Sequence, residues 1–560
     1  MEYLLSNKPF KGASKFGSIY YIGDVEILEN DLLLTEHHIV FDKSKFEAGE
    51  NFSGNYNQIR YSKTKQSLKI RNDELGMLQL YYSVINNKVF VSNNLWLIIE
   101  QLSDDEISLN KTVCASFLQY SRIPSESDTF FYNIHVLPVA TELTIDLKTL
   151  KVSNNKYWDL NHSYSSKVTI DDAIDQLYDD LSDLFGFIKN KKPDTVIGFG
   201  NSGGLDSRLI PHFCSINNLK CTGFITGNTY KIKKLKSTSH SSAHKISELY
   251  DFKNTDISYK PNDYQDRLNL DVRNNPLSNC QIYKNPYDQL PDFDLLICGG
   301  NGFIVSNDSN RWKHFDNLSG VEERALFLQQ YLGKFSFRQS SEKIANKIGL
   351  KTHSERYFFS LFEKYSSDIY EYFKSFVIEH DHKDNLSLIR SFHQSIYNRN
   401  SPAGGFESIN RTTEFSYLYY PFSIKQTLSW PLEFFLDRTI LKNLITKKIP
   451  ELAEIPDQAG RSVAEISNSF SRKVKSRLTG NGLDYKNWYN SDSQIKIYFN
   501  KVLERENPLF NSLFSTSLET KNYLKLHPFI ALDLLKFKRI LDIVYYKEFE
   551  QLKRKDFLIK

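Results

Sequence analysis

The stretch that decides the fold spans residues 196–210 and reads VIGFGNSGGLDSRLI. A short β-branched run, a turn on glycines and an apolar-periodic continuation through Ile216 predict a strand, a tight loop and a helix. Such a loop binds anions, because its backbone N–H groups and the helix dipole both favour negative charge. Ser202 and Ser207 add hydroxyl donors. Asp206 adds a carboxylate, which would repel phosphate unless a divalent cation lies between the two groups. The stretch therefore predicts a site for a magnesium-bound nucleotide.

Three phosphate-binding patterns and one structural alternative compete for this loop. A Walker loop is excluded because no lysine follows the glycines. Residues 198–203 match the dinucleotide pattern Gly-x-Gly-x-x-Gly, but the next predicted strand, residues 222–226, is not followed by the acidic residue that this pattern needs. The third pattern is Ser-Gly-Gly-Leu-Asp-Ser at residues 202–207. A plain glycine turn is the structural alternative, and six matching residues in a strand–loop–helix setting argue against it.

The third pattern resembles the pyrophosphate loop of the N-type ATP pyrophosphatases, and in its fullest form that of the asparagine synthetase family. The resemblance implies that the loop binds pyrophosphate and Asp206 binds Mg²⁺, and that residues 294–302 form a second pyrophosphate loop. The crevice at the carboxyl ends of parallel strands holds the nucleotide in this fold, which makes the backbone of residues 224–226 the candidate for adenine contacts. The residues assigned are Ser202, Gly203, Gly204, Asp206, Ser207, Gly299, Gly300 and Gly302 for ATP and pyrophosphate, and Phe224, Ile225 and Thr226 for adenine.

Bulk properties limit the classes of protein that remain. The 560-residue chain is too long for one core, so several domains are expected. Lys+Arg 71 against Asp+Glu 67 gives a net charge of +4, which argues against nucleic acid as a partner. Five scattered cysteines without a Cys-x-x-Cys pair indicate reduced thiols and a cytoplasmic location. We expect no signal peptide and no membrane span, because the apolar stretches are too short.

The chain up to about residue 160 is β-rich. Its clearest element is a hairpin of residues 76–83 and 88–92 around Asn86-Asn87. Asp73 and Gly76 before this hairpin, and a Phe-x-x-Ile-x-x-Leu-Pro turn at residues 131–138 after it, follow an order similar to that in the N-terminal domain of asparagine synthetase-like proteins. An unrelated β domain is the alternative.

In the family that the chain resembles, this domain is a glutamine amidotransferase of the N-terminal-nucleophile type. Its nucleophile is a cysteine at position 2, whereas this chain has Glu2. A carboxylate cannot replace a thiolate in attack on an amide, so we expect the fold without glutamine hydrolysis. In this respect the chain also looks like the β-lactam synthetases and lasso-peptide cyclases, whose acceptor amine is already on the substrate.

Three positions after the first loop depart from the family pattern. Phe303 stands where an aspartate follows the second glycine loop, and Tyr417 stands in place of a glutamate. Glu414, one helical turn before Tyr417, is the candidate substitute. Where the family has a catalytic lysine the chain has Arg461, which stabilises polyanions but cannot shuttle protons near neutral pH. Glu414 and Arg461 are the candidate catalytic residues.

These observations predict an α/β and α+β multidomain chain. Residues 1–162 would form a β-rich sandwich of the N-terminal-nucleophile amidotransferase type, and residues 163–462 a doubly wound, parallel-sheet ATP pyrophosphatase (synthetase) domain. Residues 463–560 would form a helical extension packed on the synthetase domain.

The function that the resemblance implies is an AMP-forming carboxylate–amine ligase that uses ATP and Mg²⁺ to form an acyl-adenylate. Its substrates would be a small-molecule or peptide carboxylate and an amine acceptor, and a homodimer or a pathway partner protein is compatible with the sequence. One alternative is a degenerate member that binds nucleotide and serves as a regulatory or scaffold protein. Another transfers the acyl group to a different nucleophile, such as a tRNA or a sugar amine.

Overall fold

The computed structural model describes most of the chain. The described residues are 3–23, 25–28, 31–40, 54–161, 167–226, 238–257, 264–274, 276–280, 290–298, 318, 320–335, 353–380, 383–398, 413–416, 427–435, 438–456, 463, 493–513 and 528–552.

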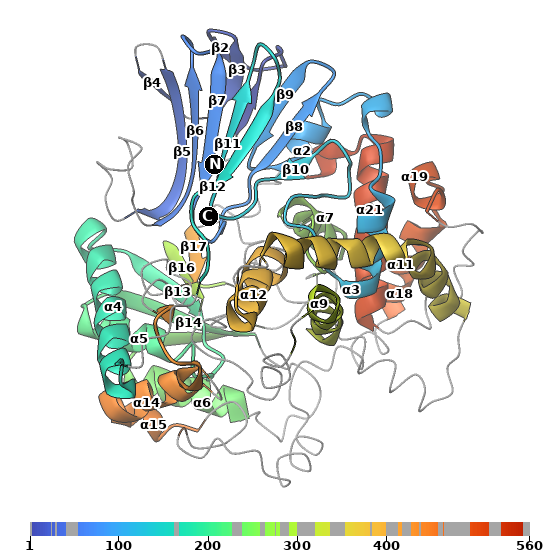
Figure 1. Cartoon of the computed structure of the whole chain (residues 1–560). Helices are drawn as coiled ribbons and strands as arrows, with labels where there is room; N and C mark the ends of the chain where they lie inside the picture. Colours follow the sequence, from blue (N-terminus) through green and yellow to red (C-terminus); the bar gives the residue numbers. More distant parts are fainter. Residues whose placement is uncertain are drawn as a thin grey trace.

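Two six-stranded antiparallel sheets pack face to face in the N-terminal part of the chain (Figure 1). The first has the order β10-β8-β9-β1-β3-β2 and the second the order β12-β11-β7-β6-β5-β4. Apolar side chains from both sheets, among them Leu5, Ile19, Ile59 and Leu143, form the core between them. The strands are β1 Leu4–Ser6, β2 Ser14–Phe16, β3 Ile19–Ile22, β4 Glu26–Leu28, β5 Asp31–Val40, β6 Gly54–Ser62, β7 Ser67–Asn72, β8 Tyr81–Ile85, β9 Lys88–Ser92, β10 His135–Val136, β11 Thr141–Asp146 and β12 Val152–Lys156.

The predicted hairpin is confirmed as β8 and β9, with Tyr81 paired to Ser92. Asn86 and Asn87 both have positive φ, 46° and 60°, as the mirror-image turn of a two-residue hairpin requires. Its first strand begins at Tyr81 rather than at Gly76, which corrects the predicted start. The preceding residues form a turn instead, because the buried carboxylate of Asp73 accepts the N–H of Leu75 and Met77.

A five-stranded parallel sheet lies below the sandwich in Figure 1. Its order is β15-β14-β13-β16-β17, and all four strand pairs are parallel. Strands β14 and β15 follow β13 on one side of it, and β16 and β17 lie on its other side. The direction in which strands are added therefore reverses between β13 and β16. In open α/β sheets ligands bind at the carboxyl ends of the strands beside such a reversal. The strands are β13 Val196–Gly200, β14 Lys220–Thr226, β15 Lys253–Ile257, β16 Leu295–Cys298 and β17 Thr413–Ser416.

Helices cover one face of the parallel sheet with apolar side chains. Ile197, Phe199 and Ile297 on that face share a core with the apolar stripe of α4 (Ile170–Lys191), including Leu177 and Leu181. That helix is capped at Thr169: the side chains of Thr169 and Asp172 each accept the other residue's backbone N–H. The helices of this part are α4 Ile170–Lys191, α5 Leu209–Ile216, α6 Thr238–Leu249, α14 Thr439–Lys448 and α15 Pro450–Ala453.

The remaining helices gather beside the outer face of the first antiparallel sheet (Figure 1). Tyr81 and Phe90 of that sheet share one core with the nine α-helices listed at the end of this paragraph. This core therefore includes residues from all three predicted domains. Trp96 Nε1, for example, donates to the carbonyl oxygen of Val272 at 3.0 Å. The predicted domain boundaries, after residues 162 and 462, stay a prediction. The helices are α2 Leu95–Ile99, α3 Lys111–Tyr120, α7 Tyr264–Asn274, α9 Val321–Phe335, α11 His353–Glu379, α12 Asn385–Phe392, α18 Ser493–Glu504, α19 Pro508–Asn511 and α21 Pro528–Tyr546, together with the separate short 3₁₀ helix Leu432–Phe434.

The chain is therefore mixed α/β, with two antiparallel sheets, one parallel sheet and a body of helices. Among the helices that the structure describes, none combines the length and the apolar composition that crossing a bilayer requires.

Candidate nucleotide-binding loop

The predicted strand, loop and helix are present as β13, residues 201–208 and α5. Asn201, the first loop residue, is buried and fixes the loop to its neighbours. Its backbone N–H donates to the carbonyl of Phe224 at 2.8 Å, and its side-chain Nδ2 donates to the carbonyl of Ala243 in α6 at 2.9 Å. The loop is thereby held at the carboxyl edge of the sheet, next to the reversal between β13 and β16.

Within the loop, backbone geometry and hydroxyl groups agree with an anion-binding turn. Gly203 has φ +68°, a conformation that costs L-residues about 1–2 kcal/mol. The Ser202 and Ser207 Oγ atoms lie 3.0 Å apart, and Ser202 Oγ accepts the N–H of Gly204 at 3.2 Å. Ser202 is exposed and Ser207 is buried, so the hydroxyl pair extends from the solvent into the base of the loop.

A buried arginine behind the loop is a feature that the sequence analysis missed. Arg208 is fully buried, and its guanidinium donates to the carbonyls of Gly203 at 2.7 Å and Gly204 at 3.2 Å. The same group donates to three carbonyls at the end of α15 and just beyond it, those of Leu452, Ile455 and Pro456, at 2.8–3.1 Å. The available signal was an arginine at the start of an otherwise apolar helix, which must find buried acceptors.

Asp206, the predicted Mg²⁺ ligand, lies in the last turn of the loop with 21% of its side chain exposed. Its Oδ2 is 3.5 Å from Nη1 of Arg438, whose side chain is 45% exposed. Burial raises the pKa of Asp206, and the Arg438 guanidinium opposes that rise. Arg438 caps α14 in the left-handed conformation, with φ +60°. A carboxylate and a cation therefore meet at the residue before Ser207, and carboxylate oxygen is a ligand that Mg²⁺ takes.

The adenine candidates lie one strand away. Phe224 and Ile225 are buried in the interior strand β14, which pairs with β13 on one side and β15 on the other. The carbonyl of Phe224 already accepts the Asn201 N–H. Of the three adenine candidates, Thr226 is the one at the carboxyl end of β14.

The other predicted site residues are only partly described. Gly299, Gly300, Gly302 and Arg461 lie outside the described residues, as do the departures Phe303 and Tyr417. Glu414 is in strand β17, paired with Leu296, and not in a helix as predicted.

Comparisons with known proteins add little to this geometry. No protein-family model and no curated protein matches the chain. A glutamine phosphoribosylpyrophosphate (PRPP) amidotransferase from B. subtilis, complexed with ADP and GMP, is 12% identical over 34% of this chain and 35% of its own, with a TM-score of 0.12. A structure of the allosteric regulatory enzyme of purine biosynthesis is 9% identical over 34% of this chain and 36% of its own, also with a TM-score of 0.12. The chain spans about a third of either protein, and TM-scores this low assign neither fold nor activity.

Proposed function

We propose that the chain binds ATP–Mg²⁺ at residues 202–207 and uses it to activate a carboxylate for amide-bond formation, without hydrolysing glutamine. The observation that carries the proposal is the position of this loop. It follows the strand at which the order of the parallel sheet reverses, and it presents hydroxyls, glycine N–H groups, a carboxylate and an arginine together. Nucleotides bind at this position in open parallel sheets.

Each group has a distinct role in this proposal. Ser202, Ser207 and the N–H groups of the glycines bind the β- and γ-phosphates as hydrogen-bond donors. Asp206 would hold Mg²⁺, and Arg438, whose Nη1 lies 3.5 Å from Asp206 Oδ2, would add a second positive group for the phosphates. Fixed positive groups around a departing pyrophosphate stabilise the charge that develops on it. ATP supplies the adenylate to which the substrate carboxylate becomes joined, and pyrophosphate leaves.

The ligase class rests on the resemblance to the asparagine synthetase family, and the absence of glutamine hydrolysis rests on Glu2. The substrates would be a small-molecule or peptide carboxylate and an amine that attacks the acyl-adenylate. A second candidate function is a nucleotide-binding regulator or scaffold. Phe303, Tyr417 and Arg461 favour it, because they replace family residues that take part in acceptor orientation and transfer.

The deciding experiment combines ATP–Mg²⁺ calorimetry with a pyrophosphate-release assay on pooled small molecules from a cell extract. Asp206→Asn should abolish both signals. Asp194→Asn is the matched control, because Asp194 is an exposed carboxylate before the amino end of the same strand, β13. Binding with release that depends on Asp206 supports the ligase, and binding without release supports the regulator. No binding by the wild-type chain would refute both.

A further inference from the structure

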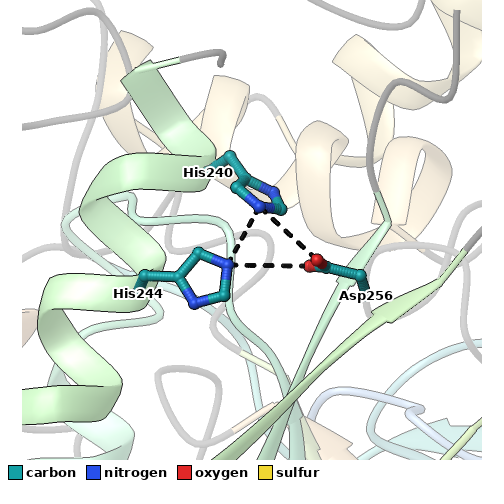
Figure 2. Close-up of side chains that lie close together, drawn as sticks. All are labelled: His240, His244 and Asp256. Carbon is teal, nitrogen blue, oxygen red and sulfur yellow. Dashed lines mark hydrogen bonds and ion pairs between the residues drawn. The ribbon is translucent and has the colours of Figure 1, made fainter. Parts of the chain in front are cut away.

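Two histidines and an aspartate come together on neighbouring elements of the parallel-sheet part. His240 and His244 are four residues apart in α6, so they lie on one face of that helix. The chain then turns back into β15, which ends one residue after Asp256. Figure 2 shows the three side chains pointing toward a common centre.

The distances between their ligand atoms are short. Nε2 of His240 is 2.9 Å from Nε2 of His244 and 3.5 Å from Oδ2 of Asp256. Nε2 of His244 is 3.9 Å from Oδ1 of Asp256. Two ligands that each lie 2.0–2.1 Å from a tetrahedral ion are about 3.4 Å apart. The three observed separations lie on both sides of that value, so one ion fits among the three side chains with little movement.

We propose that His240, His244 and Asp256 bind a divalent transition-metal ion, and that Zn²⁺ is the ion best suited to the site. Imidazole nitrogen selects Zn²⁺ and its transition-metal neighbours, whereas Mg²⁺ and Ca²⁺ take oxygen ligands. The two histidines are half-buried and Asp256 is exposed, so solvent reaches the fourth position. Three protein ligands with one open position is the arrangement of zinc sites that exchange a water or a substrate group.

The metal site adjoins the predicted nucleotide loop but shares no residue with it. Ala243, next to His244, accepts the hydrogen bond from Asn201, and Asp256 pairs with Ile225 across the sheet. A metal ion here would tie α6 to β15 at the carboxyl edge of the sheet. The Mg²⁺ assigned to Asp206 belongs to a separate, oxygen-rich set of groups. The proposal therefore stands without the proposed function, and its test needs no nucleotide.

The first test measures Zn²⁺ binding by the full-length chain after metal has been stripped with a chelator. Zn²⁺ is titrated in competition with a chromophoric chelator, and we expect one ion per chain. Replacement by Co²⁺ then reports the ligands, because nitrogen and oxygen ligands give d–d bands without a thiolate charge-transfer band. A thiolate band would place the ion on cysteine and overturn the proposal, as would an absence of Zn²⁺ binding.

The second test uses single substitutions. His244→Ala and Asp256→Asn should each weaken Zn²⁺ binding more than about 100-fold. Removal of a residue that only supports a metal ligand costs about 10- to 100-fold, so a larger loss identifies a direct ligand. Both side chains reach solvent, so the variants should fold. Lys245→Ala, an exposed change on the same helix, is the matched control and should bind as the wild type does. Equal Zn²⁺ affinity in the control and both ligand variants would mean that the cluster is a hydrogen-bonded pair of histidines beside an exposed acid.

Discussion

Replacing Arg208 with methionine tests whether the predicted phosphate loop is held in place from behind. Methionine keeps an unbranched apolar chain and removes every donor of the guanidinium. In the wild type that guanidinium is fully buried and makes five hydrogen bonds to backbone carbonyls, two in the loop and three at the end of α15 and just beyond it. The substitution therefore separates the loop from α15 without opening a large cavity.

The size of the effect follows from these contacts. A hydrogen bond from a charged donor contributes about 1.5–3 kcal/mol, so five of them would sum to more than about 7 kcal/mol. Such bonds are not additive, and relaxation recovers part of the loss. Removing the guanidinium leaves buried neutral carbonyls, and each one without another donor costs about 1–3 kcal/mol, so we expect Arg208→Met to cost about 3–5 kcal/mol in total.

Hydrogen–deuterium exchange is the suitable assay, because it reports the stability of the parallel-sheet core separately from that of the other cores. Peptides that cover β13 and α5 should exchange about 100- to 4,000-fold faster in Arg208→Met. Peptides that cover β7 in the antiparallel sheets should not change. Arg438→Met is the comparison for stability: its half-exposed side chain makes an ion pair worth less than about 1 kcal/mol, so it should leave exchange in β13 unaltered. Unchanged protection of β13 in Arg208→Met would refute the reasoning.

Three further substitutions test local geometry. Gly203→Ala should weaken ATP–Mg²⁺ binding in calorimetry, because φ +68° costs alanine about 1–2 kcal/mol; undiminished affinity would contradict the role given to the turn. Gly198→Ala places a Cβ 2.4 Å from the ring of Phe293 and should lower the melting temperature. The second change Phe293→Leu should restore the melting temperature, and a failure to do so would show that this contact is not the cause. Glu106 is buried against Lys88. Burial alone would raise the pKa of Glu106, but hydrogen bonds from Lys88, Ser103 and Asn86 lower it from 4.5 to about 2. The charged form is therefore favoured in the folded state, so Glu106→Gln should cost about 3 kcal/mol at pH 7, falling to about 1 kcal/mol at pH 3; a pH-independent cost in urea unfolding would exclude this cause.

Local sequence patterns were sufficient for the elements around the loop. The β-branched run, the glycines and the apolar spacing specify β13, the turn and α5 within a few residues, because each depends on neighbours in the chain. The parallel sheet also followed from the alternation of strands and helices. His240, His244 and Asp256, in contrast, carried no signal in the sequence, because their meeting depends on how the chain folds back from α6 into β15.

The errors came from side chains that compete with regular structure. The apolar run after Gly76 has the composition of a strand, but Asp73 accepts the N–H groups of Leu75 and Met77 and forms a turn instead. Gly76 takes φ +58° in that turn, and a Cβ there would lie 2.8 Å from Val139. Both residues that carry the resemblance to the synthetase family before the hairpin thus have a structural role. Their presence is explained without glutamine chemistry.

The orientation of the loop peptides depends on a residue that need not touch the ligand. In a trans peptide the C=O and the following N–H point in opposite directions. Arg208 binds the carbonyls of Gly203 and Gly204, so the N–H groups of Gly204 and Leu205 are turned to the side away from the guanidinium. The N–H of Gly204 indeed donates to Ser202 Oγ, which lies 3.0 Å from Ser207 Oγ. The Ser202 hydroxyl and the Gly204 N–H thus share one side of the loop, while Ser207 Oγ also donates to the Gly204 carbonyl that Arg208 binds, at 3.4 Å. A lysine at position 208, with three donors, could not satisfy five carbonyls and preserve that arrangement.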